Sequence, residues 1–149
     1  MDKLNRILIL LLLLCGGLVA CKQEDPTPIV PKGDAAQTAR EFMSALYGGN
    51  AASCRELSSL ENRDQVVALC QASQEAGASI TLDEATFVVV YQRGILATVE
   101  MRGRWSIKAF RDDGQVAIET HDTLLEPPVE LYLIYQDNKW RFDYFGGTE

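Results

Sequence analysis

The 149-residue chain has few of the residues from which catalytic and metal sites are most often built. It contains one histidine and four cysteines. No His, Cys, Asp or Glu cluster has metal-ligand spacing, and no Gly-rich phosphate loop lies between a predicted strand and a predicted helix. A metal or an organic cofactor is therefore not expected, and function has to be inferred from the location and the fold.

Basic residues are also scarce. There are 14 Lys and Arg against 21 Asp and Glu, which gives a net charge of −7. A surface of this charge repels phosphates at long range, so nucleic-acid binding is not expected. The chain equally lacks a basic patch that would bind anionic lipid headgroups. Contact with a membrane would therefore need a covalent anchor.

The one long apolar run is too short to cross a membrane. It extends from Ile7 to Ala20, whereas a spanning helix needs about 20 apolar residues. Lys3 and Arg6 precede the run, as in a cleaved secretory signal. Its last residues, Leu18-Val19-Ala20-Cys21, resemble the lipobox of bacterial lipoproteins, in which the cysteine thiol receives a diacylglyceryl group and the chain is cut before that cysteine.

This resemblance divides the chain into three parts: residues 1–20 as a lipoprotein signal peptide, residues 21–33 as the lipidated Cys21 and a Pro-rich tether, and residues 34–149 as the folded domain. It implies a place in the cell envelope. The anchor would lie in the outer membrane facing the periplasm in a diderm host, and on the outer face of the plasma membrane in a monoderm host. The alternative is a secreted protein with a free Cys21 thiol.

The first third of the domain has helical periodicity. Asp34 and Gln37 have capping-box spacing at the start of a helix that ends at Gly48-Gly49. Further helices are predicted over residues 51–60 and 63–76. Cys54 and Cys70 lie on these two helices, and an even pair outside the cytoplasm is expected to form a disulfide. A redox or metal pair is the alternative, but the spacing is not Cys-x-x-Cys.

The rest of the domain alternates with a period of two, which predicts strands over residues 86–91, 95–109, 116–125, 129–136 and 139–145. The long second strand must bend, and Gly103 is the expected position of a bulge. Short turns between the strands predict antiparallel neighbours in a meander. The fold class is therefore α+β: three N-terminal helices packed on a curved antiparallel sheet of about five strands.

This order of elements, with a bent long strand and a closing strand from Asn138 to Asp143, resembles the nuclear transport factor 2-like superfamily, which has a cone-shaped fold. The resemblance covers roughly Asp34 to Phe145. It implies a pocket between the helices and the concave face of the sheet, and dimers joined through their sheets. Members include ketosteroid isomerases and polyketide cyclases as well as non-catalytic binding domains, so the fold does not determine a reaction.

Candidate pocket residues follow from the phase of the third strand. If Val116, Ile118 and Thr120 face the core, then Asp122 also faces it and His121 points outward. A carboxylate in an apolar cone could have a raised pKa and act as a general base. The alternative places Asp122 at the rim, paired with an arginine. The residues expected to line the pocket are Phe42, Tyr91, Trp105, Asp122, Tyr135 and Trp140.

The sequence thus predicts a membrane-anchored, extracytoplasmic lipoprotein whose domain binds a small apolar ligand or a protein partner without catalysis. The alternative is a small pocket enzyme of the isomerase, cyclase or hydrolase type that uses Asp122 as its general base. A homodimer formed through the sheet is a further expectation. Cys21 is the residue whose chemistry the sequence predicts most directly.

Overall fold

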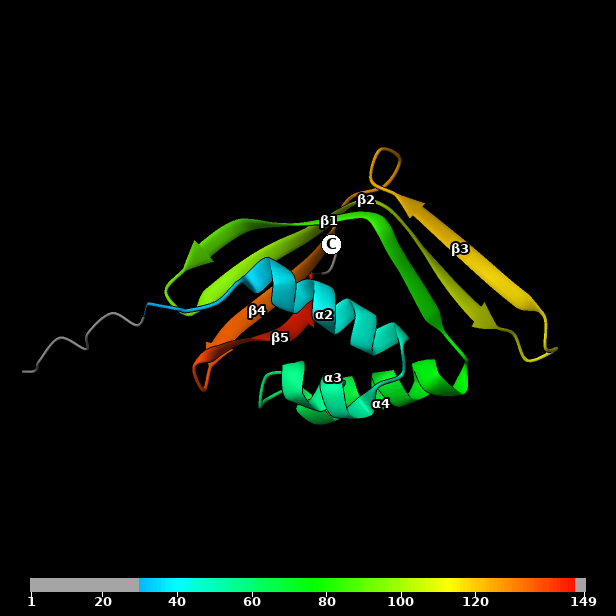
Figure 1. Cartoon of the computed structure of the whole chain (residues 1–149), viewed down its shortest axis with the longest axis horizontal. Coiled ribbons are helices and arrows are strands. Elements are labelled where there is room, and N and C mark those ends of the chain that lie inside the picture. The colour runs from blue at the N-terminus through cyan, green and yellow to red at the C-terminus, as the bar shows by residue number, and fades with distance from the viewer. Residues whose placement is uncertain (1–29, 147–149) are drawn as a thin grey trace, which may run out of the picture.

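The computed structural model describes residues 30–146, so the signal segment, Cys21 and most of the tether lie outside the described residues. Three helices lie beneath a curved antiparallel sheet (Figure 1), which confirms the predicted α+β class. None of the helices in this part of the chain is long and apolar enough to cross a membrane. The elements are α2 (Ala35–Tyr47), α3 (Ala51–Leu57), α4 (Arg63–Glu75), β1 (Ser79–Arg93), β2 (Leu96–Phe110), β3 (Val116–Asp122), β4 (Val129–Gln136) and β5 (Lys139–Phe145).

Helix α2 packs on the concave face of the sheet. It begins after Asp34, whose carboxylate accepts hydrogen bonds from the backbone N–H groups of Ala36 at 2.8 Å and Gln37 at 3.3 Å. Its apolar face is buried. There the Phe42 ring stacks on Phe142 of β5 with 3.8 Å between the ring centroids. This contact fixes the helix against the edge strand β5.

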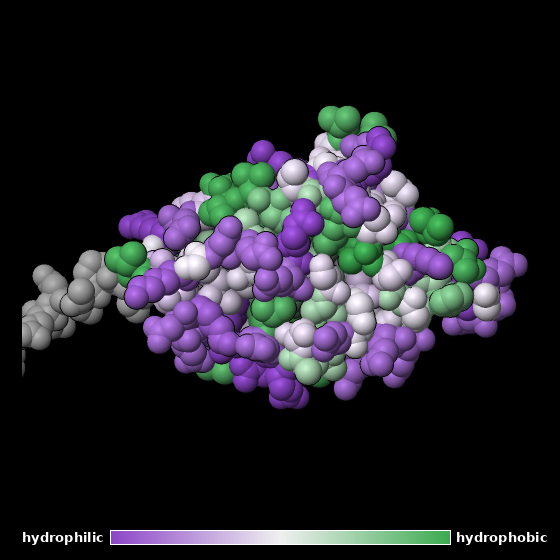
Figure 2. Space-filling model, in the orientation of Figure 1, coloured by the Kyte–Doolittle hydropathy of each residue, from purple (hydrophilic) through white to green (hydrophobic). Residues whose placement is uncertain are grey.

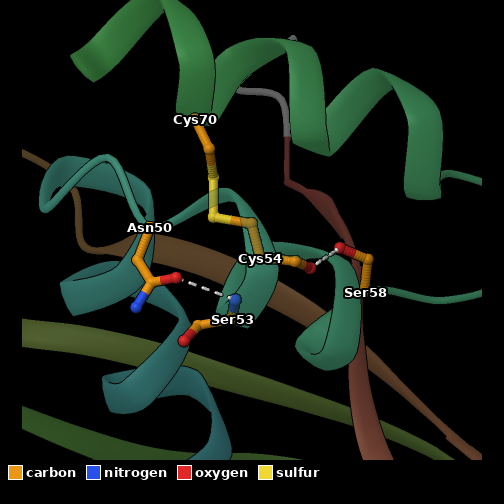
Figure 3. Close-up of a disulfide and its surroundings, with 5 residues drawn as sticks. All are labelled: Asn50, Ser53, Cys54, Ser58 and Cys70. Carbon is orange, nitrogen blue, oxygen red and sulfur yellow. Dashed lines mark hydrogen bonds between the residues drawn. A yellow bond between two sulfur atoms is a disulfide. The ribbon is translucent and has the colours of Figure 1, made fainter.

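Helices α3 and α4 form a second layer beneath α2. The predicted disulfide between Cys54 and Cys70 is present and joins them, with 6.7 Å between the Cα atoms (Figure 3). Both cysteines are fully buried, which favours a structural role over a redox or metal role. The Ser58 hydroxyl donates to the carbonyl oxygen of Cys54 at the end of α3. Closing a loop of this length contributes about 3 kcal/mol in the chain-entropy description.

The strand order differs from the predicted meander. The sheet runs β1-β2-β4-β5, and β3 also pairs with β2. The first half of β2 pairs with β4, from Leu96 to Met101, and the second half pairs with β3, from Arg104 to Phe110. The prediction was wrong because it gave each strand one neighbour on each side, whereas β2 is long enough to hold two strands along the same edge.

Gly103, where the sequence predicted a bulge, lies between the part of β2 that pairs with β4 and the part that pairs with β3. This residue has a φ of 91°, a conformation that strains residues with a side chain. A Cβ at this position would collide with the backbone carbonyl oxygen of Glu84 on β1. The register shift itself lies on β1, between Thr81 and Glu84. The close approach of β1 at this point therefore requires glycine.

Replacing Gly103 with alanine tests this requirement. We expect Gly103→Ala to lower the free energy of unfolding by about 3 kcal/mol or more, because both the positive φ and the contact with β1 are strained. Gly94→Ala is the matched control: Gly94 has a φ of 56°, but a Cβ added there would meet no atom within 4 Å, so about 1 kcal/mol is expected. Equal losses in urea denaturation would contradict the close-approach argument.

Candidate functional site

A pocket of about 280 Å³ lies between α2 and the concave face of the sheet. Strands β2, β3, β4 and β5 and the loop from β3 to β4 contribute to it, together with the last half of α2. Most of its wall is apolar, with Trp105 of β2 as its largest aromatic member. The lining residues are Met43, Tyr47, Met101, Trp105, Ile107, His121, Glu126, Pro127, Val129 and Phe145.

The polar side chains of the pocket are close to one another at its rim. The Nδ1 atom of His121 lies 3.0 Å from Oε2 of Glu126, and its Nε2 atom lies 3.5 Å from Oε1 of Glu119. The imidazole ring also stacks on Trp105, with 5.3 Å between centroids. His121 is therefore held on its face by an indole ring and on both nitrogens by carboxylates.

Tyr47 adds a hydroxyl group to this rim from the last turn of α2. Burial raises the pKa of the Tyr47 phenol, and the negative charge of Glu119 raises it further. The phenol consequently stays protonated well above neutral pH and can donate a hydrogen bond into the pocket. The lining thus includes one neutral donor, Tyr47, and one carboxylate, Glu126, and the Glu119 carboxylate lies beside His121.

The predicted phase of β3 was wrong. His121 is in register with Trp105 and shares its concave face, whereas Val116 and Ile118 are 48% and 67% exposed. The second half of β2 and β3 extend past the helices (Figure 1), so the face of this hairpin that carries Val116 and Ile118 is open to solvent, whereas Trp105 on its other face is buried. Its apolar residues therefore do not indicate which face points toward the core.

Asp122 lies on the opposite face of the sheet from the pocket. Its Oδ2 atom accepts a hydrogen bond from the Arg104 guanidinium at 3.1 Å, and its Oδ1 atom accepts one from the backbone N–H of Leu124 at 3.0 Å. The hydrogen bond from the Leu124 N–H makes the larger contribution to lowering the pKa of this carboxyl, and the hydrogen bond from Arg104 lowers it further. This is the arginine-paired arrangement that the sequence left open, and it lacks the raised pKa expected of a general base.

Of the aromatic residues expected to line the pocket, Trp105 does so. Phe42 is fully buried in the core, and Tyr135 packs edge-on against Trp140, also in the core. Tyr91 is half exposed and is paired with Thr98 at a register shift in β1. Sequence reasoning missed Tyr47 and Glu126 as pocket residues.

Two other grooves are larger than this pocket. One of about 740 Å³ runs along α2 and α3 and is lined mainly by exposed polar side chains such as Gln37, Glu41 and Asn50. Another of about 490 Å³ lies between α4 and β5, beside Leu69 and Tyr144. Among residues 30–146, no group of three or more His, Cys, Asp or Glu could hold a metal ion.

Comparison with solved structures finds similar folds at low sequence identity. The intermembrane space region of the chloroplast protein ARC6 aligns over 78% of this chain and 97% of its own, with 11% identity and a TM-score of 0.58. A putative calcium/calmodulin dependent protein kinase II association domain from Xanthomonas campestris aligns over 81% of this chain and 94% of its own, with 13% identity and a TM-score of 0.49. A SEC-C motif containing protein from Rhodopseudomonas palustris aligns over 75% of this chain and 77% of its own, with 15% identity and a TM-score of 0.45.

No protein-family model matches the chain, and no curated protein matches it. At 11% identity the likeness to the ARC6 region concerns the fold alone. Any function has to be argued from the pocket.

The place of Asp122 generates a prediction that NMR can check. We expect its carboxyl to titrate below the usual value of about 3.9, and Arg104→Ala to raise that midpoint partway, because the Leu124 N–H bond remains. Since the folded pKa is lowered, Asp122 stabilises the fold above its unfolded pKa, and this contribution is lost as pH falls through the folded pKa. A midpoint above about 6, typical of a tuned catalytic carboxylate, would restore the general-base hypothesis.

Proposed function

We propose that this protein is an extracytoplasmic lipoprotein, anchored through Cys21, whose concave pocket binds a small and mostly apolar ligand without converting it. The observation that carries the proposal is the composition of the pocket. Met43, Met101, Trp105 and Ile107 supply apolar wall, while Tyr47 and His121 supply hydrogen-bonding groups at one side. Such a combination of apolar wall and few polar groups is typical of ligand sites.

The placement of the titratable groups supports binding over catalysis. Asp122 lies away from the pocket, and its pKa is lowered. Both nitrogens of His121 face carboxylates, Glu126 at 3.0 Å and Glu119 at 3.5 Å. A general base needs a nitrogen directed at the proton that it removes, and here Nδ1 is hydrogen-bonded to Glu126 and Nε2 lies near Glu119.

The proposed anchor rests on the sequence before the described residues. Once residues 1–20 are removed, 20 acidic and 12 basic residues remain, a net charge of −8. A domain of this charge is not attracted to anionic lipid headgroups. A diacylglyceryl group supplies two acyl chains, which is enough for stable anchoring at about 0.8 kcal/mol per buried CH₂.

Indole, a neutral apolar probe, tests the pocket. We expect it to shift the NMR signals of the Trp105 ring and the Met101 methyl group, and Val129→Phe to weaken binding at least about fivefold by filling space in the pocket. Leu69→Phe is the matched control, because Leu69 lines the groove between α4 and β5 and should leave indole binding unchanged. Equal effects of the two variants would refute binding at this pocket.

Cell fractionation tests the anchor. In a bacterial host that lipidates such proteins, we expect the unaltered protein in the membrane fraction and Cys21→Ser in the soluble fraction, with a loss of mass equal to that of the lipid. Cys15→Ser is the control and should stay with the membrane, because Leu14 before Cys15 is too bulky for a lipobox. Membrane retention of Cys21→Ser would overturn the anchor.

A further inference from the structure

We infer that the pocket selects a cation, a small amine whose ammonium group lies beside Glu119 and Glu126 while its aromatic or alkyl part contacts the apolar wall. This inference rests on the proposed function and narrows the class of ligand. It starts from an asymmetry of charge. The ten lining residues include Glu126 and His121 but no Lys or Arg.

The two carboxylates approach His121 from different parts of the chain. Glu119 precedes His121 by two positions on β3, and Glu126 comes from the loop that connects β3 to β4. Their side chains are 74% and 52% exposed, whereas that of His121 is 23% exposed. Both carboxylates therefore remain accessible to a ligand that enters from solvent, and the only positive charge that the rim itself could supply is on a protonated His121.

The wall of the pocket suits the rest of an amphiphilic cation. Trp105 and Phe145 are aromatic, and an aromatic ring attracts a cation above its face. Met43 and Met101 are flexible enough to adapt to different apolar shapes. With about 280 Å³, the pocket lies near the lower end of the range of ligand sites, about 300–1,000 Å³. An anionic ligand such as a fatty acid would meet two carboxylates without a compensating Lys or Arg.

Three probes with the same indole ring isolate the charge: tryptamine, tryptophol and indole-3-acetate carry an ammonium, a hydroxyl and a carboxylate. We expect calorimetry with the purified protein at one fixed pH and low salt to rank them in that order. Tryptamine should bind about two- to fivefold more tightly than tryptophol, the effect of roughly one exposed ion pair. Added salt should narrow this difference, because exposed charges are screened.

Variants of the carboxylates identify the groups responsible. Glu119→Gln combined with Glu126→Gln should remove the preference for tryptamine and leave tryptophol binding unchanged. Glu84→Gln is the matched control, because Glu84 is also exposed but pairs with Arg104 at 3.5 Å, whereas Glu119 and Glu126 lie beside His121. It should preserve the preference. All three side chains are exposed enough that the fold should persist, which circular dichroism can verify.

The outcomes separate this inference from the proposed function. If tryptophol binds at the pocket but tryptamine binds no better, or if the double variant keeps the preference, the cation selectivity is refuted and ligand binding stands. If indole and all three probes fail to shift the Trp105 and Met101 signals, the proposed ligand-binding function fails as well. If indole-3-acetate bound more tightly than tryptamine, the pocket would prefer an anion, and the inference of a cationic ligand would be wrong.

Discussion

The pairing of β2 with two strands along one edge is the constraint on which the rest of the structure depends. Its first half holds β4 and its second half holds β3, so the sheet divides at Gly103. There Thr123 closes the division: its backbone N–H donates to the Gly103 carbonyl at 3.0 Å, and its hydroxyl accepts from the Gly103 N–H at 2.8 Å. The loop from β3 to β4 therefore starts at a fixed point on the bend.

The pocket is a consequence of this division. Met101 lies just before Gly103 and Trp105 just after it, and both line the pocket. Glu126 and Pro127 reach the pocket because their loop crosses from β3 to β4 at this place (Figure 1). The same loop carries Leu124 and Leu125 outward, 88% and 87% exposed, and an apolar projection is visible there (Figure 2).

Local signals in the sequence predicted much of the fold and less of the site. The start of α2 at Asp34 and the Cys54–Cys70 pair each depend on residues close together in the sequence, whereas the bulge predicted at Gly103 lies on the neighbouring strand, between Thr81 and Glu84. The face of β3 could not be read from Val116 and Ile118, because hydropathy reports a buried face only where something covers it. Glu119 and His121, two positions apart on one strand, were predictable as neighbours. The approach of Tyr47 and Glu126 depends on packing between distant segments, which no local pattern records.

Of the helices among residues 30–146, α2 contributes to the concave pocket and α3 and α4 do not. Those helices are instead fixed to each other by the disulfide and to β5 by Arg141, whose guanidinium donates to the backbone carbonyls of Glu56 and Ser58. Because Arg141 of β5 binds the last carbonyl groups of α3, the layer of α3 and α4 is attached to the sheet without contributing to the pocket. The residues of the pocket rim can therefore carry uncompensated negative charge, since the core that keeps the domain folded does not depend on them.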